Sequence, residues 1–327
     1  MNHGKLYKEE KLLGTGRFGQ VYLGVRTIDN VKVAIKKIMR DEKLYKQEGL
    51  SALGCLREIR LMRETSHPNL VQLLDVFISH EECGRCVNLV LELLLERDLE
   101  QVIRMQPNGL DAGAIKSLIC MLLQGLEFLH SNWIVHRDLK PGNVFISHKG
   151  YLKIGDFGFA RTFGSPDQSM SPNACTQWYR APELLLGACE YGASVDVWSA
   201  GCIFGELWTG IPLFRGAMSE YGAGNEIDQL GKIFMHLGTP TLADWHHMDT
   251  LSRFIEFQPC SSRLSDILPK GAAGVDAANE LLGELLALDP KRRIACNEAL
   301  RMGYFSKPPV AVIPGSALLA LLGFDDR

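Results

Sequence analysis

The stretch from His136 to Gly158 contains the residue types that phosphoryl transfer requires. It reads His136-Arg137-Asp138-Leu139-Lys140-Pro141-Gly142-Asn143, then a short apolar segment, then Asp156-Phe157-Gly158. Magnesium prefers oxygen ligands, which Asn143 and Asp156 can supply, and an attacking hydroxyl needs a carboxylate acceptor, which Asp138 can supply. The types and order of these residues therefore predict magnesium-dependent transfer of a phosphoryl group.

Two short apolar segments must hold these polar groups in place. Val144–Ile146 and Tyr151–Ile154 are predicted strands, and the short connection between them favours antiparallel pairing. The loop before the first strand and the loop after the second would then lie at one end of a small hairpin. This arrangement would bring Asp138 and Asp156 to the same place.

A glycine-rich segment near the start is the second candidate for chemistry. It reads Gly14-Thr15-Gly16-Arg17-Phe18-Gly19-Gln20-Val21. The spacing G-x-G-x-x-G also occurs in dinucleotide-binding folds, where it opens a helix, but here residues 21–23 continue as a strand. This favours a strand-turn-strand flap whose backbone N–H groups approach phosphate oxygens. The pattern G-x-x-x-x-G-K-[ST] does not occur, which excludes a P-loop.

A lysine and a glutamate complete the predicted phosphate site. Alternation along the third strand puts Ala34 and Lys36 on one face, where the small Ala34 leaves a slot under the glycine turn. Lys36 would contact the phosphates, and Glu58, on a helix predicted over Leu50–Glu64, would hold it extended. Either charge alone is more simply a solvated surface group, so the prediction depends on the whole set. Gly54 weakens that helix by about 1 kcal/mol relative to alanine, so we expect an external partner to hold it.

Composition limits the classes of protein that the chain can belong to. Its 327 residues are 46% hydrophobic, which is enough for two lobes with a sizeable core. The net charge of −3 gives no basic field for direct nucleic-acid binding. Nine scattered cysteines indicate reduced thiols inside the cell, and the pair Cys83 and Cys86 fits a hairpin tip better than a metal or redox site. No signal peptide is recognisable and no apolar run of about 18 residues is expected, so no membrane span is predicted.

The remaining chain divides into a strand-rich beginning and a helical remainder. Apolar–polar alternation predicts three antiparallel strands within residues 5–38 and two more around Val71–Ile78 and Val87–Leu93. Downstream, apolar spacing of three and four predicts helices over residues 115–130, 195–208, 226–237, 277–288 and 297–302. After Phe305 the composition shifts to prolines and a short apolar run, which we expect to pack on its own domain, a partner being the alternative.

Taken together, these motifs resemble those of a eukaryotic protein kinase over residues 5–306. The ordered set consists of Gly14–Gly19, Lys36, Glu58, Asp138–Asn143, Asp156–Gly158 and Ala181-Pro182-Glu183. The resemblance implies an α+β, bilobal protein kinase fold, with a small antiparallel β-sheet N-lobe carrying one regulatory helix and a larger, mainly helical C-lobe. The expected boundaries are an N-lobe over 1–93, a hinge over 94–98, a C-lobe over 99–306 and a C-terminal tail over 307–327.

The resemblance also assigns roles to residues of the catalytic machinery. Asp138 would accept the substrate hydroxyl proton, Lys140 would steady the transferred phosphate, and Asn143 with Asp156 would hold magnesium. Lys140, followed by proline, resembles the serine/threonine class and not the tyrosine class. Glu183 would form a buried structural ion pair with Arg293, a separate expectation of the resemblance.

ATP would occupy the cleft between the lobes. Residues expected to line its site are Leu13, Gly14, Thr15, Gly16, Arg17, Phe18, Gly19, Gln20, Val21, Ala34, Lys36, Glu92, Leu94 and Asp98. Glu92 and Leu94 would present hinge backbone groups to the adenine. The hinge is one residue longer than is usual in the family, so either Arg97 or Asp98 would reach the ribose.

Within the kinases, the chain resembles the cyclin-dependent kinase family. The markers are Trp178-Tyr179-Arg180-Ala181-Pro182-Glu183 and Ile227-Asp228-Gln229-Leu230. Arg57, Arg137 and Arg161 come from separate elements, and a doubly charged phosphate placed among them would relieve their repulsion. Ser171, before Pro172, is the favoured site for that phosphate. For Ser165, before Pro166, a modified and an unmodified serine are equally supported.

Several further details resemble the cyclin-dependent-kinase-activating group of that family. They are Phe163-Gly164-Ser165-Pro166, Leu56-Arg57-Glu58-Ile59, Ser66-His67-Pro68-Asn69 and Tyr304-Phe305-Ser306. The implied partners are an H-type cyclin and a RING-containing assembly factor, and the implied location is the nucleus, with the cytoplasm as a second place. The implied substrates carry Ser/Thr-Pro sites, in the RNA polymerase II tail and in activation loops of other cyclin-dependent kinases.

Other functions and several departures from the family pattern stay open at this point. A cell-cycle or elongation kinase of the same family and a non-catalytic pseudokinase scaffold are the alternatives. Gln177 stands where relatives have arginine, Ser171 replaces threonine, and residues 217–225 form an insertion before the helix at Ile227. These departures affect the expected partner and the activation-loop requirement more than the catalytic residues.

Overall fold

The computed structural model describes residues 6–16, 19–39, 52–81, 84–106, 109–163, 177–216 and 226–324. Some predictions fall outside these ranges: the nucleotide-binding roles of Arg17 and Phe18, the phosphosites Ser165 and Ser171, and the insertion at 217–225. Cys83 of the predicted hairpin tip also lies outside them.

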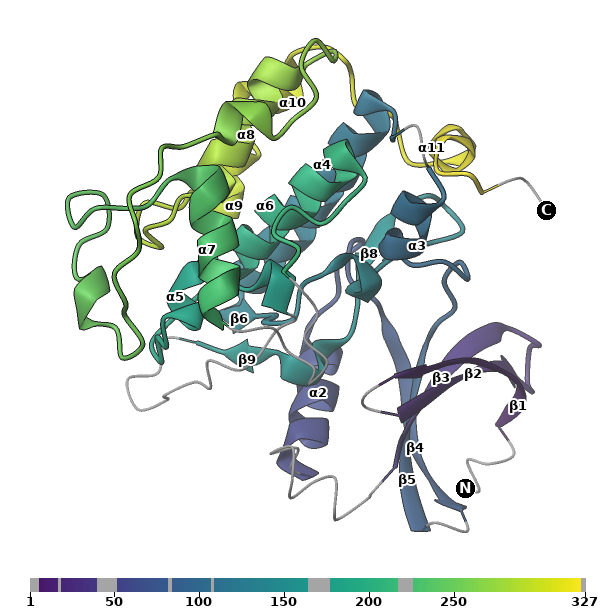
Figure 1. The fold of residues 1–327 in the computed structure, drawn as a ribbon. Helices are drawn as coiled ribbons and strands as arrows, with labels where there is room; N and C mark the ends of the chain where they lie inside the picture. Colours follow the sequence, from purple (N-terminus) through teal and green to yellow (C-terminus); the bar gives the residue numbers. More distant parts are fainter. Residues whose placement is uncertain are drawn as a thin grey trace.

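The N-terminal part is an antiparallel sheet of five strands in the order β1-β2-β3-β5-β4, with one helix beside it (Figure 1). The elements are β1 (Tyr7–Gly16), β2 (Gly19–Arg26), β3 (Lys32–Met39), α2 (Ala52–Glu64), β4 (Leu73–Glu81) and β5 (Gly84–Glu92). All five strands and the helix were expected from the sequence.

Alternation along β3 determines which side chains this sheet buries. Val33 and Ile35 are fully buried and pack with Tyr7, Phe77 and Val90 in a separate small core. The alternation predicted Val31 on the same face, but it precedes the strand and is 42% exposed. The opposite face of β3 carries Ala34 and Lys36, as the period of two requires.

The C-terminal part is mainly helical and is built around two long helices, α4 and α6 (Figure 1). Its helices are α3 (Leu99–Arg104), α4 (Ala112–Ser131), α5 (Pro182–Leu185), α6 (Ser194–Thr209), α7 (Glu226–Leu237), α8 (Val275–Leu285), α9 (Cys296–Ala299), α10 (Gly303–Ser306) and α11 (Ser316–Leu321). Its strands are β6 (Ile134–Val135), β7 (Val144–Ile146), β8 (Leu152–Ile154) and β9 (Arg161–Thr162).

Helix α4 corrects one expectation from the sequence. No apolar run long enough to cross a membrane was predicted, but α4 has 20 residues and a mean hydropathy of 1.5 over its most apolar window. Most of that window is buried within the protein, and its apolar residues belong to the main core. The composition of α4 is therefore that of a central core helix.

The predicted catalytic hairpin is present. Strands β7 and β8 pair antiparallel with Val144 opposite Ile154 and Ile146 opposite Leu152. The loop that contains Asp138 and the loop that contains Asp156 therefore meet at the same end of the hairpin, where Gly155 N–H donates to the Asn143 carbonyl over 2.9 Å.

The chain after Phe305 packs on its own domain. Leu318 and Leu322, in and just after α11, are 0% and 1% exposed. Figure 1 shows α11 beside α3, so the end of the described chain returns to the junction between the two parts of the molecule. This confirms the expectation that the apolar tail packs internally.

Candidate active site

The amine of Lys36 lies between two carboxylates from different parts of the chain. Its Nζ is 2.9 Å from Oε1 of Glu58 on α2 and 2.9 Å from Oδ1 of Asp156 after β8. Glu58 is 5% exposed and faces inward from a helix whose other side is open to solvent. In protein kinases this lysine–glutamate pair must be formed for activity, and it is formed here.

The charges of this group stabilise one another. Burial alone would lower the pKa of Lys36, but the negative charges of Asp156 and Glu58 outweigh it and raise that pKa. Burial alone would raise the pKa of Asp156, but the positive charge of Lys36 outweighs it and lowers that pKa. Lys36 therefore carries a positive charge and Asp156 a negative charge, and both can interact with a charged ligand.

The Asp138 carboxylate lies at the bottom of the same site. It is 4% exposed, and its Oδ2 accepts a hydrogen bond from Asn143 Nδ2 over 2.9 Å. Lys140 Nζ lies 3.2 Å from the same oxygen. Both contacts hold the carboxylate in one orientation. Since the Asn143 amide nitrogen faces Asp138, its amide oxygen points away and is available to a ligand.

Asp196 on α6 holds the backbone of the loop that carries Asp138 through hydrogen bonds. Oδ2 of Asp196 accepts from the His136 N–H over 2.8 Å, and Oδ1 accepts from the Arg137 N–H over 2.9 Å. Arg137 has a φ of 72°, in the left-handed region that a long side chain rarely adopts. A strained backbone of this kind persists only when its surroundings hold it, and Asp196 supplies part of that support.

The second loop is fixed by ring packing. Phe157 is 1% exposed and meets the His136 ring edge to face at 5.4 Å, while Asp156 has a left-handed φ of 59°. His136 Nε2 is 2.8 Å from the Gly155 carbonyl oxygen. Burial of Phe157 thus turns the neighbouring carboxylate of Asp156 toward Lys36.

The segment at 92–98 connects the two parts of the molecule. Glu92 pairs with Val33 across the sheet, and its carboxylate accepts from Lys153 Nζ over 2.7 Å. Leu94 is partly buried against the main core. Asp98 caps α3, since its Oδ1 accepts from the Gln101 N–H over 2.8 Å.

Arg97 and Asp98, the two candidates for binding the ribose, have different contacts in the structure. The Arg97 guanidinium donates to the Gly323 carbonyl over 3.0 Å and lies over the Phe324 ring, so it is engaged by the C-terminal tail. Asp98 uses one carboxylate oxygen for the helix cap. Asp98 therefore stays the candidate, as a prediction.

The glycine segment forms the predicted strand-turn-strand flap. Gly16 and Gly19 are opposite each other at the ends of β1 and β2. Gly19 has a φ of 141°, and a Cβ there would lie 1.8 Å from the Lys37 carbonyl oxygen, so only glycine fits. Leu13, Gly14, Thr15, Gln20 and Val21 lie on the two strands that meet at this turn.

The three arginines lie close enough to repel one another. Burial, together with the positive charges of Arg57 and Arg137, lowers the pKa of Arg161 to about 10. Arg57 is on the exposed side of α2, Arg137 is buried in the catalytic loop over the Tyr191 ring, and Arg161 begins β9. An anion among them would remove this repulsion.

Glu183 and Arg293 form a two-pronged ion pair. Nη1 and Nη2 of Arg293 lie 2.7 Å and 3.0 Å from the two carboxylate oxygens of Glu183, and the guanidinium also lies over the Trp198 ring. Both side chains are buried. This pair connects the segment after the catalytic machinery to the helical core.

Two buried acids of α6, Asp196 and Glu206, were not among the residues predicted for the site. Asp196 holds the catalytic loop, and Glu206, 3% exposed, accepts from the Tyr179 hydroxyl over 2.7 Å. Burial raises the pKa of Glu206 to about 7. A buried charge needs a partner, so their position in the helix was a usable signal.

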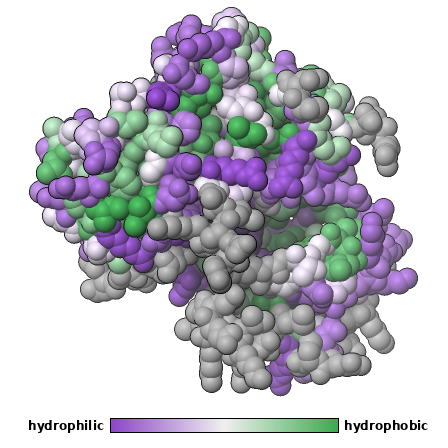
Figure 2. Space-filling view, viewed as in Figure 1, coloured by the Kyte–Doolittle hydropathy of each residue, from purple (hydrophilic) through white to green (hydrophobic). Residues whose placement is uncertain are grey.

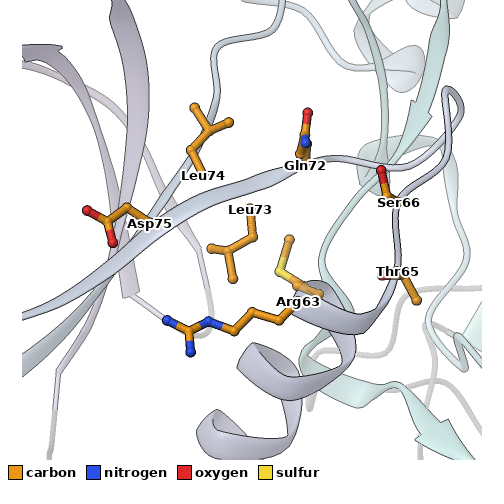
Figure 3. Close-up of a pocket in the computed structure, with 8 residues that line it drawn as sticks. Arg63, Thr65, Ser66, Gln72, Leu73, Leu74 and Asp75 are labelled. Atoms are coloured by element: carbon orange, nitrogen blue, oxygen red, sulfur yellow. The ribbon is translucent and has the colours of Figure 1, made fainter.

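Figure 2 shows a hollow between the large lobe above and the small lobe below, with hydrophobic residues along its edge. A separate cavity of about 180 Å³ lies between the end of α2 and β4, lined among others by Arg63, Leu74 and Asp75 (Figure 3). It contains none of the residues of the predicted site, so it is not part of it.

Comparison with known proteins agrees with this geometry. Residues 7–305 match the protein kinase domain family. The chain is 40% identical to cyclin-dependent kinase D-1 of Arabidopsis thaliana over 310 residues, which cover 94% of this chain and 73% of that protein. It is 40% identical to cyclin-dependent kinase 7 of Carassius auratus over 309 residues, covering 94% and 85%.

A solved structure is also similar. It is that of the CAK complex from Chaetomium thermophilum bound to ATP-gamma-S, and one of its chains matches with a TM-score of 0.83 and 35% identity. The match covers 96% of this chain and 95% of that one. With the Lys36–Glu58 pair formed and Asp138 in place, the chain is a serine/threonine protein kinase that belongs to the cyclin-dependent kinase family.

Proposed function

We propose that this kinase is of the cyclin-dependent-kinase-activating type and that its site works with the roles expected from the sequence. The observation that carries the proposal is the convergence of Lys36, Glu58 and Asp156 opposite Asp138. Lys36 contacts ATP phosphates and Glu58 holds it in place. Asp138 accepts the proton of the attacking serine or threonine hydroxyl, and Lys140 steadies the phosphate in transfer.

Magnesium would be held by Asn143 and Asp156. The donor set fits a hard cation, because the Asp156 pKa is lowered by Lys36 and the Asn143 amide oxygen faces away from Asp138. When bound, magnesium neutralises charge on the ATP phosphates. The residues of this chain orient the two reactants and move the proton.

A cyclin is the proposed partner, bound at the exposed side of α2. Leu56 is 62% exposed there, while Glu58 on the inner side is buried. A partner on Leu56 would therefore stabilise the helix that positions Glu58. The similar structure is described as a CAK complex, which supports assembly with a cyclin partner. An H-type cyclin and a RING-containing assembly factor are proposed from the family resemblance. A kinase with these partners would act in the nucleus.

The proposed substrates are the polymerase II tail and the activation segments of other cyclin-dependent kinases. The experiment is phosphate transfer by the kinase–cyclin complex to a Ser-Pro repeat peptide and to an inactive cyclin-dependent kinase. We expect both to be phosphorylated, and a repeat peptide with alanine in place of proline to be a poor substrate. Activity on neither substrate, or recovery of a mitotic cyclin from the native cell, would contradict the proposal.

Phosphorylation of Ser171 is the proposed activating modification. The charges of Arg57, Arg137 and Arg161 support it, because burial together with the positive charges of Arg57 and Arg137 lowers the pKa of Arg161 to about 10. Ser171→Ala should lower kcat about tenfold without an assembly factor, since one to three charge-assisted hydrogen bonds are lost. Ser165→Ala is the matched control in the same segment, with a smaller effect. Equal rates of wild type and Ser171→Ala would refute the assignment.

A further inference from the structure

We infer that the end of the C-terminal tail is a clamp on the hinge, and that Arg97 and Phe324 are positioning residues for nucleotide binding. The inference rests on the proposed role of the hinge in binding ATP. The sequence predicts a hinge one residue longer than usual. Arg97, within this hinge, contacts the tail.

The tail is attached along its length before it reaches the hinge. Lys116 Nζ on α4 donates to the Lys307 carbonyl over 2.6 Å, and Ser117 Oγ donates to the Val312 carbonyl over 2.6 Å. A Cβ on Gly113 would lie 2.8 Å from the Val310 carbonyl oxygen, so glycine lets the tail backbone pass close to α4. Leu318 then fixes α11 in the core, with 0% exposure.

The end of α11 places Phe324 by its own backbone geometry. Gly323 has a φ of 75°, its N–H donates to the Ala320 carbonyl, and the Phe324 N–H donates to the Leu319 carbonyl over 2.9 Å. This is the Schellman pattern of a helix end, which glycine favours. The pattern turns the chain so that the Gly323 carbonyl and the Phe324 ring lie at a fixed place beyond the helix.

Arg97 contacts both groups. Its Nη1 donates to the Gly323 carbonyl over 3.0 Å, and its guanidinium carbon lies 5.4 Å from the centre of the Phe324 ring. The segment before it is held from the other side, since the Leu95 N–H donates to the Ile146 carbonyl of β7 over 3.0 Å. Asp98, the ribose candidate, follows Arg97 directly. The hinge is thus fixed between β7 and the tail.

A hinge fixed in this way needs little further ordering when a nucleotide binds, and preordering favours affinity. Loss of the clamp should therefore weaken ATP binding and leave the phosphoryl-transfer step unchanged. Because the Phe324 ring contacts the hinge at Arg97, the two residues should act as one unit.

The test is a double-mutant cycle in the full chain with its cyclin. Arg97→Ala loses one hydrogen bond and one cation–π contact and should raise KM for ATP about fivefold with kcat unchanged. Phe324→Ala loses only the cation–π contact and should raise KM about twofold. The double variant should be no worse than Arg97→Ala. Phe324→Tyr keeps the ring and should keep the wild-type KM.

Gln106→Ala is the matched control. Its amide donates to the Leu321 carbonyl of the tail over 3.3 Å, but it lies beyond α3, away from the hinge, so KM should not change. Unchanged KM in Arg97→Ala or Phe324→Ala, or effects that add in the double variant, would overturn the clamp.

Failure of the clamp can be told apart from failure of the hinge assignment. Ala34→Phe would fill the proposed adenine slot and should abolish binding of ATP-γ-S measured by calorimetry. If Ala34→Phe binds normally, the proposed nucleotide site is wrong. If Ala34→Phe loses binding while the Arg97 and Phe324 variants bind as wild type, only the clamp is wrong.

Discussion

The Asp138 carboxylate and the Lys36 amine belong to the same site, but they are supported in very different ways. Asp138 is on a loop whose backbone is bonded to Asp196, in a helix buried nearly throughout. Lys36 depends on Glu58, whose helix α2 has a solvent-exposed outer side with Leu56 62% exposed. Asp138 is therefore held by the buried core of the large lobe, whereas Lys36 is held by a helix at the surface of the small lobe.

This difference shows where regulation can act. Buried groups bonded on several sides have one arrangement, so the catalytic loop is formed whenever the large lobe is folded. A helix with one side exposed to solvent can shift at small cost, because few contacts oppose its movement. The arrangement of the loop at Asp138 is therefore fixed by the core, while the Lys36–Glu58 pair can be made conditional on a partner.

The largest expected effect is on kcat and comes from a substitution of Asp138, which the core holds in place. Asp138→Asn removes the proton acceptor but keeps the size of the side chain, so kcat should fall about 10³-fold, the usual contribution of a general base. KM for ATP should change little. Peptide phosphorylation under single-turnover conditions measures this, and Asp276→Asn, at an exposed position of α8, is the control. A fall of less than tenfold would mean that Asp138 is not the acceptor.

The second prediction compares how much a buried ion pair of the large lobe and an exposed ion pair of α2 contribute to the free energy of unfolding. Arg293→Met leaves the Glu183 carboxylate buried without its cation, which should lower the free energy of unfolding by about 3–5 kcal/mol. Arg60→Met breaks an exposed pair with Glu64 on α2 and should cost less than about 0.5 kcal/mol. Urea unfolding of both variants makes the comparison. Equal losses of unfolding free energy in the two variants would contradict the difference between the buried core and the exposed helix α2.

The local order of residues was enough to predict most of the fold and which polar residues the fold brings together. The alternation in β3, the hairpin of β7 and β8 and the amphipathic spacing of α7 are local signals, and each element was found where it was expected. The short helix α3 was missed because its six residues are defined by a cap at Asp98 and not by periodicity. Helix α11 was treated as an apolar run because a helix of six residues is marginal alone and depends on packing, here the burial of Leu318 in the main core.

The supporting groups of the site could not be assigned in the same way. Asp196 is distant in sequence from His136 and Arg137, and only the packing of α6 against the catalytic loop brings them together. The contact of Arg97 with Gly323 joins residues 226 positions apart, which no local pattern can indicate. The sequence predicts a role for Asp138, but it did not indicate which residues hold Asp138 in place.

A smaller effect should appear on the exposed side of α2. Leu56→Ser should change the free energy of unfolding of the free chain by less than about 0.5 kcal/mol, as for most exposed sites. If a cyclin covers this side, the same change should lower cyclin-stimulated activity about tenfold, the loss of one buried leucine contact at an interface. Leu61→Ser, 3% exposed on the inner side, is the contrasting variant and should destabilise the free chain. Full stimulation of Leu56→Ser would place the partner elsewhere.

The smallest expected effect is a pH dependence within the large lobe, at Glu206. Burial raises the pKa of this carboxyl from 4.5 to about 7, so the folded chain keeps a proton that the unfolded chain has released. Stability should therefore fall as pH rises, by about 1 kcal/mol between pH 6 and pH 8. Glu206→Gln cannot ionise and still accepts from the Tyr179 hydroxyl, so this decrease should disappear in that variant. Urea unfolding at both pH values, with the exposed Glu280→Gln as control, measures it. A wild-type slope that persists in Glu206→Gln would assign the proton to another group.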